Sequence, residues 1–475
     1  MKTADVADAA RKRLSVDTRA LAAFRLILAV CLLVDLSMRA RNLRVFYTDA
    51  GVLPRDVLAE LFPGFARFSL HALSGGVVVQ VVLLCVSALA AVALAVGLRP
   101  RLAGFVSLVL HVSLYARNPY VLNGGDTMLI VLLLLAVFLP LGARWSVDGL
   151  RRDGTSVPDT VLLAPAVAVL LFIVVIYTSN AVLRYRGEPW MSGEAVRRVF
   201  GLETVTVLLG PYLAELPLLL EAINWAWVAM LTVSVLLVIL VGGARAALTA
   251  SFVAAHVAMA LTLRLGVFPL VVIAGLVMFF PPVFWDRVEE RVPSDSVVSA
   301  VPHRVVALSR DSTAPTLERF LSYAGVAVAV TVVAFVLVWQ GAALGYVGFS
   351  DGVTDPDEYA WKMYSPTPQE TYGWYFVPVE LASGERVDGL QGGTVDAEAP
   401  PDVADAYPST LWYRYLSDID AGSETRQRAF ADWVCGTARE HGEPRTVELR
   451  HVERRVVLDG SDEESRYGLL THDCG

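Results

Sequence analysis

The chain of 475 residues contains very little lysine, and it lacks the common motifs of soluble enzymes. Lys2, Lys12 and Lys362 are the only lysines among 39 basic residues, and the formal net charge is -8. A negatively charged protein repels phosphates, which argues against nucleic acid as a partner. The chain has no phosphate-binding glycine loop followed by lysine, no dinucleotide fingerprint and no HExxH motif, so a nucleotide-driven pump is not expected. An acidic, lysine-poor composition resembles that of salt-adapted proteins, although drift in a GC-rich genome explains it as well.

Cysteine is also scarce, with four residues in the whole chain. No pair has the spacing of a metal site, so the sequence predicts no zinc or iron-sulfur centre. Cys435 and Cys474 both lie in the polar C-terminal part. An oxidising compartment would permit a disulfide between them, but the sequence leaves open whether the two sulfurs meet.

Apolar residues are abundant: 55% of the chain is hydrophobic, and the mean hydropathy is +0.54. A transmembrane helix needs about 20 mainly apolar residues. The sequence therefore predicts an all-α polytopic membrane bundle of about nine spans. These spans are Ala20–Met38, Gly76–Leu98, Leu102–Tyr115, Thr127–Leu141, Thr160–Leu183, Pro217–Val241, Ala246–Leu263, Val267–Phe284 and Leu321–Leu344.

Basic residues in short loops predict the orientation, because such loops tend to stay in the cytoplasm. The first 19 residues carry five of them: Lys2, Arg11, Lys12, Arg13 and Arg19. We therefore expect a cytoplasmic N-terminus in a multi-pass protein of the cell membrane. With an odd number of spans, the C-terminal part would lie outside the cytoplasm. The loop that contains Arg39, Arg41, Arg44, Arg55 and Arg67 disagrees, because it would then be external.

Charge separates the C-terminal part from the rest. Residues 346–475 contain 25 acidic and 11 basic residues, whereas the preceding part contains 22 acidic and 28 basic residues. We therefore expect a separate acidic domain, called the tail below. Alternation over 374–381 and 446–458 predicts strands, and apolar spacing over 423–440 predicts a helix, so the tail should be a small extracytoplasmic α+β domain.

The expected organisation has five parts. Residues 1–19 form a cytoplasmic leader, 20–285 the membrane domain, 286–320 a cytoplasmic linker, 321–345 the last span and 346–475 the tail. Between the fifth and sixth spans, Ser192 could cap an interfacial helix. Its Val196, Val199 and Phe200 would face lipid.

Polar side chains inside the spans are the main functional signal, because an ionisable group at a helix centre costs about 2.5 to 3.5 kcal/mol on insertion scales. Most of them fall near the outer side under the expected orientation, while His256 lies deeper. The collection predicts an outward-facing polar pocket lined by Arg184, Arg117, Asp126, His256, Arg264 and Asn180. The alternative is that Arg117 with Asp126, or Arg264 with Glu221, are ion pairs that only fix helix packing.

Several segments resemble the HTTM family, whose members share their membrane region with vitamin K-dependent gamma-glutamyl carboxylases. The segments are Phe46–Arg55 (FYTDAGVLPR), Arg117–Asp126 (RNPYVLNGGD), Phe138–Gly142 with Ser146–Asp148, Tyr177–Gly193, His256–Phe268 and Phe280–Asp286 (FPPVFWD). They cover residues 15–290. The tail, with its Met363–Pro366 and Trp412–Leu416 segments, looks like the tails of other HTTM proteins.

The resemblance implies a membrane-embedded reaction in the carboxylases, in which a lysine acts as base on vitamin K hydroquinone and a glutamate becomes carboxylated. This chain has Arg184 at the position of that lysine. Arginine cannot be deprotonated in proteins, so it cannot be that base. A family histidine before the fourth helix is replaced near Gly124, Gly125 and Asp126, whereas His256 aligns with another family histidine.

These observations support three hypotheses. The first is an outer-facing pocket that binds a quinone-like or lipid-like molecule, with Arg184 as a fixed positive charge for its head. The second is a variant carboxylase- or epoxidase-like enzyme that uses His256 or Asp126 as base. The third is a structural or transport protein whose tail docks an extracytoplasmic protein partner. Whether the chain is an enzyme, and whether it takes a quinone or another cofactor, remains open at this point.

Overall fold

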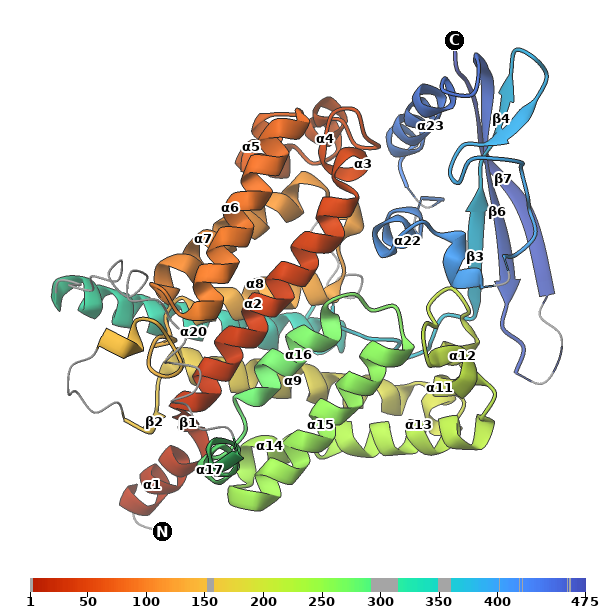
Figure 1. The fold of residues 1–475 in the computed structure, drawn as a ribbon. Helices are drawn as coiled ribbons and strands as arrows, with labels where there is room; N and C mark the ends of the chain where they lie inside the picture. Colours follow the sequence, from red (N-terminus) through yellow and green to blue (C-terminus); the bar gives the residue numbers. More distant parts are fainter. Residues whose placement is uncertain are drawn as a thin grey trace.

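A computed structural model describes residues 3–151, 158–291, 315–348, 360–400, 402–417, 419–420, 422–458, 460 and 463–475. Within these ranges the chain forms a helical bundle followed by a domain that contains a β-sheet (Figure 1). The greater part of the expected linker, 292–314, lies outside the described residues.

The first half of the bundle is built on α2, which follows a short amphipathic helix, α1. The elements of this half are α1 (Thr3–Leu14), β1 (Val16–Asp17), α2 (Thr18–Arg41), α3 (Leu43–Tyr47), α4 (Arg55–Leu61), α5 (Pro63–Phe68), η1 (Leu70–Leu73), α6 (Val77–Val96), α7 (Pro100–Arg117), η2 (Pro119–Val121), α8 (Gly124–Ala136), η3 (Gly149–Arg151) and β2 (Thr160–Val161). Asp17 caps α2 by accepting from the Arg19 N–H. Gly97 ends α6 at φ 69°, a conformation that glycine adopts without steric cost.

The second half contains the helices that surround the candidate site. They are α9 (Ala164–Arg186), α10 (Glu188–Met191), α11 (Ala195–Gly201), α12 (Gly210–Ala214), α13 (Pro217–Thr232), α14 (Leu236–Ile239), α15 (Gly242–Thr262), α16 (Phe268–Val277), α17 (Pro282–Arg291) and α20 (Pro315–Ala343). Helix α16 is buried along nearly its whole length and packs against α2, α8, α9 and α15. It is therefore the centre of the bundle, which explains its uniformly apolar sequence.

All nine expected spans contain helix, but only five helices are long and apolar enough to cross a bilayer: α2, α6, α9, α15 and α20. The prediction of about nine spans is therefore not confirmed within the described ranges. Helix α8 has 13 residues, or about 20 Å, which is short of a hydrocarbon core of about 30 Å. Helices α16 and α17 bend by 105° at Pro281 and Pro282, where proline interrupts the backbone hydrogen bonds.

The tail is an antiparallel sheet with helices between it and the bundle. Its elements are β3 (Thr371–Phe376), β4 (Pro378–Leu381), β5 (Arg386–Asp388), η4 (Val403–Ala406), α22 (Thr410–Leu416), α23 (Glu424–Ala438), β6 (Pro444–Arg455) and β7 (Glu463–Asp473). Along one edge of the long strand β6, β4 pairs with its first residues and β3 with its last ones. Strand β5 pairs with β4, and β7 pairs with the other edge of β6. The predicted strands and the predicted helix of the tail are confirmed, and a disulfide joins Cys435 to Cys474, next to the end of β7.

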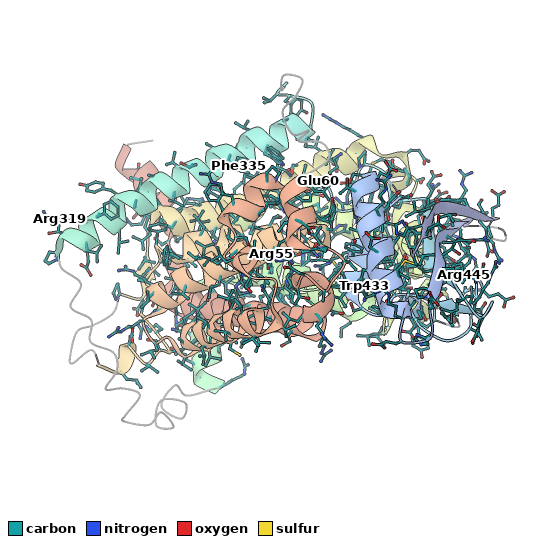
Figure 2. The ribbon with its side chains drawn as sticks, turned by 90° about the horizontal axis from the view of Figure 1, so that it is seen from above. Arg55, Glu60, Arg319, Phe335, Trp433 and Arg445 are labelled. Carbon is teal, nitrogen blue, oxygen red and sulfur yellow. A yellow bond between two sulfur atoms is a disulfide. The ribbon has the colours of Figure 1, made fainter. Side chains whose placement is uncertain are left out.

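The tail packs directly on one end of the bundle. Figure 2 shows Glu60 of the bundle near α23, which carries Trp433, and Glu60 accepts a hydrogen bond from Thr425 Oγ1. The ring of Phe46 lies 5.0 Å from that of Trp412, so one hydrophobic cluster includes residues of both parts. The N-terminus lies at the opposite end of the molecule in Figure 1.

Candidate functional site

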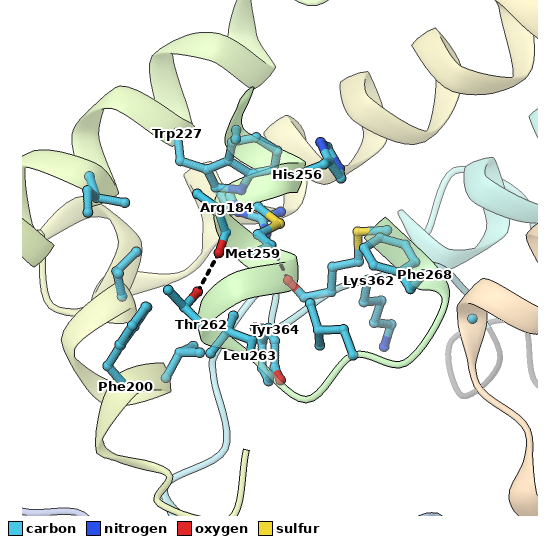
Figure 3. A pocket seen from close by; sticks show the side chains of 18 of the residues that line it. Arg184, Phe200, Trp227, His256, Met259, Thr262, Leu263, Phe268, Lys362 and Tyr364 are labelled. Atoms are coloured by element: carbon cyan, nitrogen blue, oxygen red, sulfur yellow. Dashed lines mark hydrogen bonds between the residues drawn. The ribbon is translucent and has the colours of Figure 1, made fainter. Parts of the chain in front are cut away.

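A cavity of about 530 Å³ lies where helices of the bundle meet residues 360–364 of the tail. Most of its helical lining comes from α11, α13 and α15, and α8, α9, α10, α12 and α16 contribute one or two residues each (Figure 3). Most of the wall is apolar, with Trp227 and Met230 from α13, Met259 from α15 and Phe200 from α11. A mainly apolar cavity with a few polar groups is typical of small-molecule sites.

Arg184 is the buried cation of this cavity. It lies in the last turn of α9 and is 2% exposed. Its Nη1 donates to Asn180 Oδ1 at 2.9 Å, and its Nη2 donates to Met363 O at 2.8 Å. Its guanidinium lies 4.2 Å from the centre of the Trp190 ring. All these partners are neutral, and within the described ranges Arg184 Nε has no hydrogen-bond partner.

An uncompensated buried cation is unfavourable unless something supplies negative charge or electron-rich oxygen. Among the described residues, Arg184 forms no ion pair with a carboxylate. The arrangement therefore favours a ligand with an anionic or acceptor head at this end of the cavity. The planar guanidinium suits such a head because it can donate two parallel hydrogen bonds.

Asn180 connects Arg184 to the tail without lining the cavity itself. Its Nδ2 donates to Trp361 O at 2.5 Å, while its Oδ1 accepts from Arg184 and from Ser365 Oγ. Asn180 and Arg184 are one helical turn apart on α9, which places both on one face. Asn180 is therefore a positioning residue for the arginine.

His256 lies on the wall formed by α15. Its Nδ1 is 2.9 Å from Phe252 O, and because a carbonyl oxygen only accepts, Nδ1 is the donor. In the neutral ring Nε2 carries the lone pair, and it lies 3.5 Å from Tyr177 OH. The rings of Tyr177, Trp227 and Phe268 are close by, so the imidazole is buried in aromatic surroundings. This geometry can accept a proton or a hydrogen bond.

The tail contributes a wall that the sequence analysis did not assign to the site. Residues 360–364 line the cavity, including Lys362 and Tyr364, and burial raises the pKa of Tyr364 above its ordinary value. Trp361 Nε1 donates to Gly124 O at 3.0 Å, and Trp190 Nε1 donates to Tyr364 O at 3.0 Å. The position of Lys362 beside the Met363–Pro366 motif was a signal that could have pointed to this wall.

Helix α11 also differs from the expectation. It begins at Ala195, and Ser192 ends α10 instead of capping α11. Val196, Val199 and Phe200 are buried and line the cavity rather than facing lipid. The reason is that α12 and α13 pack on α11 and Tyr364 packs against the same cluster, so the apolar stripe of α11 meets protein.

Arg117, Asp126 and Arg264 do not line the cavity. Arg117 donates to Leu53 O and lies 3.6 Å from Asp49. Arg264 donates to Ala404 O of the tail, and burial lowers its pKa. The two ion pairs considered as the packing alternative are therefore replaced by other contacts. Of the six candidate residues, Arg184 and His256 line the cavity, Asn180 holds Arg184 in place, and the other three lie elsewhere.

Asp126 belongs to a buried ionic cluster at the junction of bundle and tail. It lies 3.1 Å from Arg39 of α2 and 3.0 Å from Arg414 of α22. Arg39 also contacts Asp35 at 2.8 Å and donates to Tyr47 OH. Two carboxylates and two guanidinium groups balance within the cluster. Because Asp126 is held between two cations, it is a poor candidate for a base.

Metal ligands are not gathered at the cavity or elsewhere in the described ranges, where no group of three or more His, Cys, Asp or Glu side chains could hold an ion.

Comparison with known families gives one match: the model of the HTTM domain matches residues 14–285. Comparison with curated proteins gives no match, and comparison with solved structures gives none either.

Proposed function

Because the chain belongs to the HTTM family and has several helices apolar enough to cross a bilayer, we propose that it is a multi-pass membrane protein that binds an amphipathic molecule in the cavity at Arg184. The ligand is quinone-like or lipid-like. Its head accepts hydrogen bonds from the guanidinium, and its apolar part contacts Trp227, Met230 and Met259.

The observation that carries this proposal is the charge of Arg184. The side chain is 2% exposed, its hydrogen-bond partners are neutral, and it lies at the edge of a mainly apolar cavity. Arg39 and Arg414 pair with the carboxylate of Asp126, whereas Arg25 and Arg245 donate to backbone carbonyls, as Arg184 does. Arg184 differs from Arg25 and Arg245 because it lines a mainly apolar cavity. An anionic or quinol oxygen would complete the coordination of Arg184.

We further propose that the tail lies outside the cytoplasm and the N-terminus inside. The basic leader supports this orientation. The disulfide between Cys435 and Cys474 supports it independently, because disulfides persist in oxidising compartments. The acidic surface of the tail would then suit a salt-rich exterior.

The experiment is to purify the protein in lipid nanodiscs and identify the bound small molecules by mass spectrometry after extraction. Arg184→Gln removes the charge but keeps a hydrogen-bonding amide. Arg186→Gln is the matched control, because Arg186 is exposed in the same turn and donates to Leu344 O. We expect one molecule to be enriched in the wild type and in the Arg186 variant, and depleted in the Arg184 variant. An empty wild-type cavity contradicts the proposal.

The geometry of His256 favours a second candidate, a modifying enzyme that uses a quinol. His256 lines the cavity, and in the neutral ring Nε2, which lies 3.5 Å from Tyr177 OH, could accept a proton from a bound quinol. The test incubates the protein with reduced quinone, oxygen as the oxidant, a glutamate-containing peptide as the acceptor and labelled carbon dioxide. An enzyme consumes the quinol and loses this activity in His256→Asn, whereas a binding protein consumes neither quinol nor carbon dioxide. If the cavity is empty and crosslinking captures a protein on the tail, the structural or transport function replaces both candidates.

A further inference from the structure

The cavity opens sideways through the surface of the membrane domain. Among its lining residues, Ile223 and Ala226 of α13 and Ala258 of α15 are exposed. Ile223 lines the cavity with 37% of its surface exposed. These residues define the side mouth between α13 and α15.

The packing of the two helices explains this opening. Helix α13 packs on α9 and α11, whereas α15 packs on α16. Where the two helices face the cavity, several of the side chains are small, namely Ala226, Ala255 and Ala258. Small side chains on both walls leave space between the helices that larger ones would fill.

The outer faces of α13 and α15 are mainly apolar, although Glu221 of α13 is exposed. Leu219 and Trp225 of α13 are 44% exposed each, and Val257 and Leu261 of α15 are 45% and 44% exposed. Helix α15 is one of the five helices that could span a bilayer, and its exposed surface here lacks charge. Exposed aliphatic surface of this kind is stable against lipid and costly against water. The side mouth therefore faces hydrocarbon.

We propose that the ligand enters sideways from the bilayer through the side mouth. Its head then lies at Arg184, and its alkyl chain extends between α13 and α15 into the lipid. This inference rests on the proposed function and adds the source and shape of the ligand: a long-tailed amphiphile dissolved in the membrane. A cavity of about 530 Å³ holds the head of the ligand and the first part of its alkyl chain. The site then recognises the head of the ligand and tolerates any length of alkyl chain beyond the side mouth.

The first test blocks the side mouth. Ala258→Trp and Ala226→Trp place a large ring in the opening, while Ala260→Trp places the same ring on an exposed part of α15 that does not line the cavity. Liposomes loaded with a long-chain benzoquinone or with lysophosphatidic acid are mixed with the protein in nanodiscs that contain no probe. Uptake of the probe by the protein is followed by mass spectrometry. We expect uptake to slow by about tenfold or more in both blocked variants and to match the wild type in Ala260→Trp. Gel filtration shows whether each variant is folded.

The second test varies the alkyl chain of the same two probes. Uptake at equilibrium should fall when this chain is removed, because the apolar wall of the cavity is then left uncovered. It should be unchanged when a long alkyl chain is lengthened further. Side entry is overturned if both blocked variants are folded and take up the probes at the wild-type rate. It is also overturned if affinity falls steadily as the alkyl chain is lengthened. Either result leaves the proposed function standing. A wild type that carries no molecule and takes up neither probe defeats the proposed function itself.

Discussion

Removing Arg414 should separate the tail from the bundle, because this side chain brings a positive charge from α22 to the buried Asp126 of α8. Asp126 is completely buried, and the side chain of Arg414 is 7% exposed. In Arg414→Met, Asp35 and Asp126 share only Arg39, so one negative charge remains uncompensated. Breaking a buried ion pair from one side costs roughly 3 to 5 kcal/mol. We expect the free energy of unfolding to fall by that amount.

The assay is denaturant unfolding in detergent micelles, followed by tryptophan fluorescence and by proteolysis of the tail. Arg428→Met is the matched control, because its pair with Glu424 is exposed and worth about 0 to 1 kcal/mol. The double variant Asp126→Asn with Arg414→Met should regain part of the loss, since it also removes the unpaired carboxylate. Equal stability of Arg414→Met and Arg428→Met would refute the reasoning.

Three further predictions concern other parts of the molecule. Burial lowers the pKa of His71 to about 4 from 6.5, so between these pH values the unfolded chain binds a proton that the folded chain does not. The free energy of unfolding should be full above pH 6.5 and fall by up to about 3 kcal/mol towards pH 4. His71→Gln should not show this loss in pH-dependent unfolding. Gly266 has φ +61°, and a Cβ there would lie 2.4 Å from Arg414 Nη2, so Gly266→Ala should lower the melting temperature, and an unchanged value would contradict this contact. Reducing the disulfide between Cys435 and Cys474, which are 39 residues apart, should destabilise the tail by about 2 to 5 kcal/mol in a proteolysis assay, and a tail equally resistant with and without reductant would argue against it.

The sequence predicted the family, the helical bundle and the fold of the tail because these depend on local patterns. Apolar runs locate helices wherever they pack, and the HTTM match over 14–285 confirms the resemblance found in the motifs. Hydropathy did not reveal the bend between α16 and α17, although Pro281 and Pro282 were visible in the sequence. Counting apolar residues says nothing of where a helix axis turns.

Part of the candidate site was predictable: His256 of α15 was expected beside Arg184, and the contact between Asn180 and Arg184 follows from their sharing one helix. Asn180 and Arg184 are one turn apart on α9, so their meeting follows from helical geometry. Asp126 was placed in the same pocket because it too is polar and near the outer side. Its real partners, Arg39 and Arg414, come from positions 87 residues before it and 288 residues after it.

The sequence by itself determined that the chain is a helical HTTM protein with an acidic tail, because hydropathy, charge and motifs are properties of neighbouring residues. Only the tertiary structure decided that the tail lines the cavity, that α11 turns its apolar stripe inward and that a side mouth opens between α13 and α15. The physical reason is that a buried charge or an apolar face takes whichever partner the packing of distant segments provides. Arg184 meets Met363, and Arg414 meets Asp126, through that packing alone.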